Sequence, residues 1–316
     1  MSRTRILVAG SINMDDLLYI PHQPQEDGAV SVSHTEQLPG GHGSNCASAL
    51  AALGVQVGMV GAVGDDSNGR ILLEDLASRG IDISCVDKIA DEPTGRVIIP
   101  SCGNEHHMYV IRGANDKFDP NIKRAIASFR PDALVIFDPS WATFEKLRDI
   151  KKVNDIQIPV YWCPGGINAG DPSFQFMLDV SDVAIVNLVE RDALFDPASH
   201  QAFLKNGREL ITTLGKNGAR FERGDIDKIV SVSETRVSDT VGAGDAFIAG
   251  YVLARLRDLS PENRLQFANA AGAVAVGSSG ARARSNALAE LAKSLPPFEP
   301  AMFVNKPILA NQENYL

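Results

Sequence analysis

The sequence lacks long apolar runs, basic runs and closely paired cysteines. A membrane-spanning helix needs roughly 18 or more consecutive apolar residues, and no run approaches that length. The chain carries 30 lysines and arginines against 39 aspartates and glutamates, a net charge of −9, so nucleic acid is not an expected partner. Its four cysteines are far apart and form no CxxC pair, which predicts free thiols rather than a disulfide framework or a zinc site.

Two common nucleotide-binding motifs are also missing. No GxxxxGK[ST] segment is present, which excludes a P-loop, and no GxGxxG follows the first apolar run, which argues against a Rossmann dehydrogenase. No signal peptide is visible, so we expect a cytoplasmic protein without membrane contact. The 316 residues, 44% hydrophobic and 22% charged, are typical of a soluble globular protein with one large α/β domain or two smaller ones.

Apolar runs that resemble strands alternate along the chain with helical patterns. This alternation predicts a mainly parallel sheet covered by helices on both faces. The expected strands are 6–9, 57–60, 133–137, 160–163, 183–186 and 210–214. The expected helices are 46–53, 68–79, 121–128, 143–153 and 198–206.

The most informative segment is DTVGAGD at 239–245, which ends in the carboxylate of Asp245 and continues into an apolar helical stretch. The first N–H groups of a helix have no internal partner, and the helix dipole adds partial positive charge there. Glycine lets successive amides converge on one anionic oxygen, so the turn is predicted to bind a phosphate. A carboxylate beside a phosphate can serve as a general base that takes a proton from an attacking hydroxyl. The alternative is a plain glycine-rich turn whose aspartate only interacts favourably with the helix dipole. The converging amides would be those of Gly242, Ala243 and Gly244.

Several other motifs follow in a consistent order. They are GSINMD (10–15), GGHGSN (40–45), GAVGDD (61–66), RGAN (112–115), NLVE (187–190) and TLGKNG (213–218). Together with DTVGAGD they resemble the ribokinase-like (PfkB) carbohydrate kinases, and among these the ribokinases most of all. The resemblance extends from about residue 6 to about residue 295, and so many motifs in one order are highly specific.

The resemblance implies a doubly wound, mainly parallel α/β sheet flanked by helices over residues 1–295, with a small β-sheet lid. The lid segments are expected at about 13–38 and 95–112, where short β-type runs occur without helices between them. A plain edge extension of the main sheet is the alternative. In many relatives two lids pack together, so we expect a homodimer. Residues 296–316 would form a C-terminal tail.

The activity implied is ATP-dependent transfer of the γ-phosphoryl group to a primary sugar hydroxyl, with Asp245 as the base. Asn187 and Glu190 match the NxxE motif that helps to hold Mg²⁺ and its waters near the nucleotide phosphates in this family. Considered alone, the same pair is an ordinary helix capping box, and the two roles can coexist.

The sugar-binding end would use the first two motifs. A carboxylate and amides can satisfy adjacent hydroxyls, and glycines let the ring approach the backbone. Asp16 has no counterpart in the family and is expected to face solvent. The implied sugar-binding residues are Asn13, Asp15, Gly40, Gly41, His42 and Asn45, with Asp245.

One position departs from the ribokinase pattern. Ribokinases typically have lysine after the paired glycines, where this chain has His42. Histidine is shorter and can be neutral at pH 7, so the identity of the sugar stays open. A structural histidine without a ligand role is the alternative.

The nucleotide and monovalent-cation sites are implied by the same resemblance. The small residues around Asn269 suit either a purine or a closely packed helix. Arg284 stands where a serine is usual, and its charge could replace the cation, so K⁺ activation stays open. The implied nucleotide-binding residues are Asn187, Thr213, Gly215, Gly218, Gly244 and Asn269. The implied monovalent-cation positions are Asp239, Val241, Ala275, Ser278 and Gly280.

We therefore predict a sugar kinase that uses ATP, with ribose as the leading substrate. A nucleoside kinase, a fructokinase and a keto-deoxygluconate kinase of the same fold are the enzyme alternatives. A catalytically silent sugar-binding regulator is the alternative from another class. Intact Asp245, Gly242, Gly244 and Glu190 argue against it.

Overall fold

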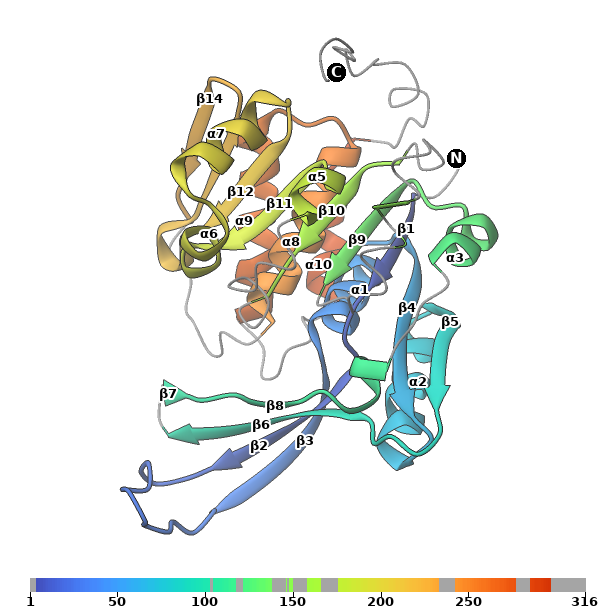
Figure 1. Cartoon of the computed structure of the whole chain (residues 1–316), viewed down its shortest axis with the longest axis vertical. Coiled ribbons are helices and arrows are strands. Elements are labelled where there is room, and N and C mark those ends of the chain that lie inside the picture. The colour runs from blue at the N-terminus through green and yellow to red at the C-terminus, as the bar shows by residue number, and fades with distance from the viewer. Residues whose placement is uncertain are drawn as a thin grey trace, which may run out of the picture.

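Nine strands form one large sheet in the order β14-β13-β12-β11-β10-β9-β1-β4-β5 (Figure 1). The structure is a computed structural model that describes residues 4–102, 105–117, 122–137, 146, 148–149, 158–165, 176–232, 242–276 and 285–296. The strands of this sheet are β1 (Arg5–Ala9), β4 (Gln56–Gly64), β5 (Asp82–Ile89), β9 (Ala133–Phe137), β10 (Val160–Cys163), β11 (Val183–Asn187), β12 (Glu209–Thr213), β13 (Ala219–Arg223) and β14 (Ile226–Val230).

The strands from β12 to β5 are parallel, and the β13–β14 hairpin adds an antiparallel edge. Alternate residues of β1 enter different cores, Ile6 and Val8 on one side and Leu7 and Ala9 on the other. A strand that is buried on both faces must be apolar throughout, which explains the continuous apolar runs in the sequence.

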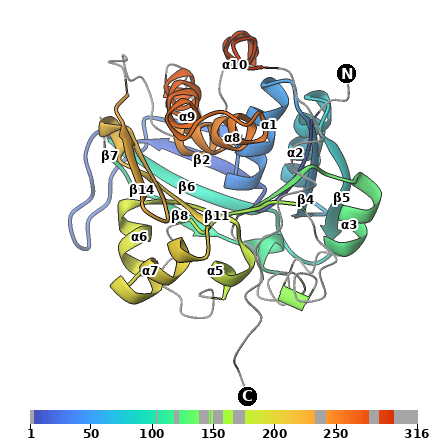
Figure 2. The same cartoon turned by 90° about the horizontal axis from the view of Figure 1, so that it is seen from above.

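Helices cover both faces of the sheet (Figure 2). The helices on one face are α1 (His42–Ala52), α2 (Ser67–Ser78), α8 (Ala243–Leu256), α9 (Pro261–Val276) and α10 (Ser285–Ala292). The helices on the other face are α3 (Ile122–Phe129), α5 (Met177–Val180), α6 (Leu188–Leu194) and α7 (Pro197–Lys205). The described part of the chain also contains the short 3₁₀ helices η1 (Gly113–Lys117) and η3 (Gly215–Asn217). The predicted doubly wound α/β fold is confirmed.

A second, five-stranded sheet projects beyond one end of the large sheet (Figure 1). Its order is β3-β2-β6-β7, and β8 pairs with the same β6. Within the described residues it is not hydrogen-bonded to the large sheet, so the edge-extension alternative is wrong. Its strands are β2 (Asn13–Tyr19), β3 (His34–Gly40), β6 (Gly95–Cys102), β7 (Glu105–His106) and β8 (Tyr109–Ile111).

The order of the strands reverses at β1, which lies between β4 and β9. In open α/β sheets, ligands bind outside the carboxyl ends of the strands at such a switch point. Here those ends are Gly10, directly after β1, and Phe137, the last residue of β9. A β-carbon on Gly10 would lie 2.7 Å from Cβ of Phe137, so glycine is needed for this close approach.

Most predicted elements occur within a few residues of their expected bounds. The predicted helix 143–153 lies almost entirely outside the described residues. None of the helices in the described part of the chain is long and apolar enough to cross a bilayer.

Candidate active site

Asp245 lies in the first turn of α8 and is 5% exposed. Gly242 precedes this helix with φ of 79°, a conformation that glycine adopts without strain. The first bond of the helix runs from the N–H of Ala246 to the carbonyl of Gly242, so the preceding amides have no partner within the helix. A β-carbon on Gly244 would meet no atom of the described structure within 4 Å. The helix start therefore offers backbone donors suited to an anion, and no described residue occupies the place of a β-carbon on Gly244.

The carboxylate of Asp245 is held at both oxygens by the first turn of α1. Nδ1 of His42 lies 3.0 Å from Oδ1 of Asp245, and Nδ2 of Asn45 donates to Oδ2 over 3.0 Å. The N-termini of α1 and α8 thus meet at one carboxylate, as the neighbouring positions of the two helices show (Figure 2). Opposite an ionised carboxylate, Nδ1 of His42 must carry the proton, in either charge state of the ring.

His42 belongs to this site rather than to the core. Its side chain is 55% exposed, and its ring lies parallel to that of Phe137 with centroids 6.2 Å apart. The structure thus favours a functional position over the structural-histidine alternative. One turn further along α1, burial raises the pKa of the Cys46 thiol well above its ordinary value, and the charge of Asp245 raises it further. Cys46 is therefore a neutral neighbour of the base.

Asn13 and Asp15 lie on one face of β2, two residues apart, and each is 6% exposed. A β-carbon on Gly40 would lie 2.0 Å from Oδ2 of Asp15, which explains the first glycine of the GGHGSN motif. Gly41 has φ of 95°, and a β-carbon there would lie 2.7 Å from the carbonyl oxygen of Ser11. The two motifs of the predicted sugar site are therefore in direct contact.

Asp16 does not face solvent, so that prediction is wrong. It is 6% exposed on the opposite face of β2, where it forms an ion pair of 2.7 Å with Arg96. Gln37 donates a second hydrogen bond to it over 2.7 Å. These two partners come from strands on either side of β2, and they satisfy the buried charge.

Asn187 and Glu190 form a reciprocal capping box at the start of α6. The N–H of Glu190 donates to Oδ1 of Asn187 over 2.9 Å, while Oε2 and Oε1 of Glu190 accept from the backbone and side-chain nitrogens of Asn187. The capping role is thus present. Among the described residues, no cluster of three or more acidic, histidine or cysteine side chains could form a metal cage. A cation here would have to take part of its shell from water or phosphate, as Mg²⁺ commonly does.

Several of the residues predicted for the nucleotide side lie near the β14 edge of the large sheet, next to β12 and β13. Thr213 ends β12, and Gly215 begins η3 with φ of 58° and open space around it. A β-carbon on Gly218 would lie 2.0 Å from the carbonyl oxygen of Val230. The same carbonyl accepts a hydrogen bond from Nδ2 of Asn269 over 3.1 Å.

The small residues of α9 around Asn269 pack against α8. A β-carbon on Gly250 would lie 2.8 Å from Cβ of Ala271, and one on Gly272 would lie 3.2 Å from the carbonyl oxygen of Ala243. These contacts favour the helix-packing alternative for this part of α9. Of the predicted monovalent-cation positions, only Ala275 is described, buried in α9. Asp239, Val241, Ser278, Gly280 and Arg284 lie outside the described residues.

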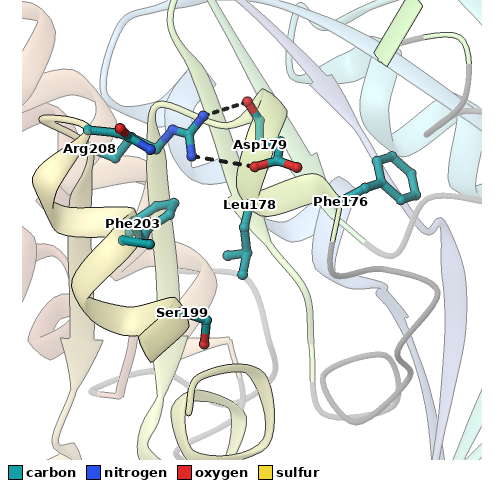
Figure 3. Close-up of a pocket in the computed structure, with 8 residues that line it drawn as sticks. Phe176, Leu178, Asp179, Ser199, Phe203 and Arg208 are labelled. Carbon is teal, nitrogen blue, oxygen red and sulfur yellow. Dashed lines mark hydrogen bonds and ion pairs between the residues drawn. The ribbon is translucent and has the colours of Figure 1, made fainter. Parts of the chain in front are cut away.

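A separate pocket of about 340 Å³ lies between α5 and α7 (Figure 3). Phe176, Leu178 and Phe203 contribute apolar surface, and a side-chain nitrogen of Arg208 donates to the carbonyl of Asp179 over 2.7 Å. These helices cover the face opposite to α1 and α8 (Figure 2). The pocket therefore contains none of the predicted sugar-binding residues.

Comparison with known proteins identifies the family. A model of the pfkB family of carbohydrate kinases matches residues 3–287. The chain belongs to this family. It is therefore a carbohydrate kinase by family, a phosphotransferase with a sugar hydroxyl as acceptor, as the motifs predicted.

Individual relatives cover nearly the whole chain. An ATP-dependent ribose-1-phosphate kinase of Halopiger xanaduensis is 30% identical over 296 residues, which are 90% of this chain and 95% of the relative. A ribokinase of Bacillus subtilis is 28% identical over 279 residues, 88% of this chain and 94% of that protein. The structure of Arabidopsis thaliana ribokinase complexed with ribose and ATP has a TM-score of 0.77 at 24% identity, covering 93% of this chain and 99% of that one. The pfkB fold is thus confirmed by structure as well as by sequence.

The structure also adds residues that the motif analysis did not assign to the kinase site. Phe137 ends an ordinary buried strand, and no local signal distinguishes it from other core residues. Asn115 lies in the RGAN motif, which supported the family resemblance without a role for each residue. Its side chain contacts the predicted sugar-binding residue Asn13 over 2.9 Å.

Proposed function

We propose that this pfkB-family protein is an ATP-dependent sugar kinase with Asp245 as its general base and D-ribose as the leading substrate. The main support is the clamping of Asp245 by His42 and Asn45 at the start of α8, beside open space. Asp15 touches the same region, because it lies against Gly40, two residues before His42.

The reaction follows from this arrangement. Asp245 takes the proton from a primary hydroxyl as the hydroxyl oxygen bonds to the γ-phosphorus and the bond to the departing ADP oxygen breaks. The amides of Gly242, Ala243 and Gly244 would stabilise the charge on the moving phosphoryl group. Because Asp245 is buried, few waters compete with the sugar for the base.

Mg²⁺ would be held near Asn187 and Glu190 through water, since carboxylate and amide oxygens match its chemistry. When bound, it would neutralise charge on the nucleotide phosphates. The capping hydrogen bonds fix the orientation of Glu190, and each of its carboxylate oxygens keeps a further lone pair for this second role. Thr213, Gly215, Gly218 and Asn269 are proposed for the adenosine end of ATP. Comparing the rate in KCl with the rate in NaCl at equal ionic strength tests the proposed K⁺ positions.

Ribose 1-phosphate is a second candidate substrate, supported by the 30% identical relative named for that activity. Both candidates carry a free primary hydroxyl on a five-carbon sugar. Only ribose 1-phosphate carries a phosphate, which requires a hydrogen-bond donor or a cation in the pocket. The half-exposed side chain of His42 could supply such a donor.

We also propose that the second sheet is a lid and that two lids form a homodimer. Tyr109 and Ile111 lie on the face of this sheet that carries Asp16, and they are 60% and 42% exposed. Val97 and Ile99, on the face that carries Asn13 and Asp15, are buried. Light scattering should give a dimer, and Tyr109→Asp should shift it toward monomer. A monomeric native chain at micromolar concentration would contradict the dimer.

The function is tested by ATP consumption with D-ribose, D-ribose 1-phosphate, D-fructose, keto-deoxygluconate and purine nucleosides. We expect turnover on a ribose compound, and Asp245→Asn should lower it by about two to four orders of magnitude while sugar binding survives. Asp87→Asn, an exposed change on β5, is the matched control. Nucleoside phosphorylation with both ribose compounds inert would contradict the substrate, and an active Asp245→Asn variant would contradict the base.

A further inference from the structure

Asn115 connects two ends of the second sheet. It lies where the chain leaves this sheet after β8, and it contacts the loop before β2, where the chain enters the sheet. It lies in η1, directly after the segment that contains β8. Its Oδ1 accepts from the backbone N–H of Ile12 over 3.1 Å. Its Nδ2 donates to the carbonyl of Arg112 over 3.0 Å and to Oδ1 of Asn13 over 2.9 Å. Both ends of the Asn115 amide are therefore engaged.

These partners determine which way both amides face. A backbone N–H can only donate and a backbone carbonyl can only accept, so Ile12 and Arg112 permit one orientation of the Asn115 side chain. Its Nδ2 faces three oxygens, the carbonyls of Arg112 at 3.0 Å and Ile12 at 3.4 Å and Oδ1 of Asn13 at 2.9 Å. A nitrogen of Asn13 in that place would set one donor against another, so Asn13 must offer Oδ1. The remaining polar atom of the Asn13 side chain is Nδ2, a hydrogen-bond donor.

Gly95 makes this contact possible. It pairs with Asn13 across β2 and β6. A β-carbon on Gly95 would lie 2.1 Å from Nδ2 of Asn115 and 2.3 Å from Oδ1 of Asn13. Any other side chain would push the two amides apart, and its β-carbon would also lie 3.0 Å from the carbonyl oxygen of Arg112. The glycine therefore has a steric reason that involves this pair first.

We propose that Asn115 is a positioning residue that fixes Asn13 as a hydrogen-bond donor toward the sugar. This inference rests on the proposed sugar site at Asn13 and Asp15. The ionised carboxylate of Asp15 can only accept, so the two residues make opposite demands on the ligand. Adjacent hydroxyls satisfy both demands, because each hydroxyl can donate and accept. The pair thus selects a vicinal diol over a deoxy or ammonium-bearing sugar.

The test begins with Asn115→Asp, which keeps the shape of the side chain and replaces its donor with an acceptor. The contact with the N–H of Ile12 survives, and the hydrogen bond to the carbonyl of Arg112 is lost. Oδ1 of Asn13 would face another oxygen, so its amide must turn over. We expect the Kd for D-ribose to rise at least about tenfold, with the KM for ATP and the kcat at saturating ribose within about threefold of the native values. Calorimetry with a non-hydrolysable ATP analogue measures the Kd.

A double-mutant cycle distinguishes positioning from a general structural role. Asn13→Ala should weaken ribose binding by itself. If Asn115 acts through Asn13, adding Asn115→Asp to that variant should change the Kd by less than about twofold. Multiplicative effects in the double variant would overturn the proposal.

Two further variants protect the test from a folding artefact. Gly95→Ala separates the two amides without removing either, and should give the same loss for ribose and the same non-additivity with Asn13→Ala. Asn206→Asp, an exposed change at the end of α7, is the control for added charge. If Asn115→Asp fails to fold, the Gly95→Ala cycle decides the matter alone.

The outcomes separate this inference from the proposed function. If Asn13→Ala leaves the ribose Kd unchanged, both the proposed sugar site and the inference are wrong. If Asn13→Ala weakens binding but neither Asn115→Asp nor Gly95→Ala does, only the inference is wrong. A native chain that binds inosine and not ribose overturns the ribose assignment, and the same cycle is then measured with inosine.

Discussion

His42 occupies a position of the GGHGSN motif and contacts the carboxylate of Asp245 from there. Where ribokinases typically have a lysine, this chain has a shorter donor that reaches the carboxylate of Asp245 over 3.0 Å. With Asn45 on the other oxygen, the base has a neutral donor at one oxygen and an imidazole at the other. From this contact we propose a role for His42 in the reaction as well as in sugar binding.

The role of His42 as a donor can be tested by substitution. His42→Asn retains an N–H donor close to the position of Nδ1, so kcat should stay within about threefold. His42→Leu removes a hydrogen bond to a charged group, worth about 1.5–3 kcal/mol, and should lower kcat by an order of magnitude or more. His42→Lys should raise kcat/KM on ribose relative to other sugars and nucleosides. Equal rates for the leucine and asparagine variants would show that the contact with Asp245 is incidental.

Glu190 is tested through its dependence on Mg²⁺. Glu190→Gln retains an oxygen for the cap but removes the charge, so the Mg²⁺ concentration for half-maximal rate should rise about tenfold or more. The KM for the sugar should change much less. Rates titrated with MgCl₂ at saturating ATP and sugar measure both quantities. An unchanged Mg²⁺ profile would leave Glu190 with its capping role alone.

At the scale of elements, the junction between β3 and α1 brings the sugar and base residues together. The chain passes through Gly40 and Gly41 with no room for side chains, because Asp15 and the loop after β1 lie against them. The position of Asp15 relative to α1 thus depends on this turn.

Gly40→Ala is expected to disturb that junction. Its β-carbon would lie 2.0 Å from Oδ2 of Asp15, so either the carboxylate or the turn must move. We expect the KM for the sugar to rise at least about tenfold while the KM for ATP stays within about twofold. Steady-state kinetics in both substrates measures the split. Gly54→Ala is a steric control, since its β-carbon would meet no described atom within 4 Å, although its φ of 84° adds strain. A similar loss in both variants would show that the effect does not arise from the contact with Asp15.

At the scale of the whole molecule, a buried ionic cluster joins the sheet to two helices. Glu209 at the start of β12 is 1% exposed and contacts Arg255 of α8 over 2.7 Å and Arg264 of α9 over 3.2 Å. Burial alone would raise the pKa of Glu209, but Arg255, Arg264 and the hydroxyl of Tyr251 outweigh it, and the net effect lowers that pKa. The cluster thus holds α8, and with it Asp245, against the sheet.

Removing this charge should destabilise the fold in a pH-dependent way. Glu209→Gln removes the counter-charge shared by Arg223, Arg255 and Arg264 and should lower the free energy of unfolding at pH 7 by about 3–5 kcal/mol. A carboxyl group whose pKa is lower in the folded than in the unfolded chain stabilises the fold at pH values above its unfolded pKa, which is about 4.3. This stabilisation is lost as the pH falls through the folded pKa. The difference from the native chain should therefore begin to shrink as the pH falls below about 4 and shrink further with more acid. Urea unfolding at pH 7 and pH 3.5 measures it, with the exposed Glu74→Gln as control. A difference independent of pH would show that the charge is not what stabilises the cluster.

Much of the fold could be predicted from local pattern. The strands at 133–137 and 160–163 have the predicted bounds, because continuous apolar runs end at polar or turn residues. The β13–β14 hairpin was not predicted, since its mixed sequence, with only part of it buried, lacks a strong period. Helix α1 begins four residues earlier than predicted, because the glycines of GGHG obscure its first turn.

The sequence by itself determined the family and the doubly wound fold class and pointed to Asp245 as the proposed base, because these depend on local motifs and on their order. Only the tertiary structure decided which residues hold that base, since His42 and Asp245 are 203 positions apart. The burial of Asp16 and the contact between Asn115 and Asn13 were likewise invisible in the sequence. Hydrogen bonds between distant segments depend on sheet register and helix placement, which no local pattern specifies.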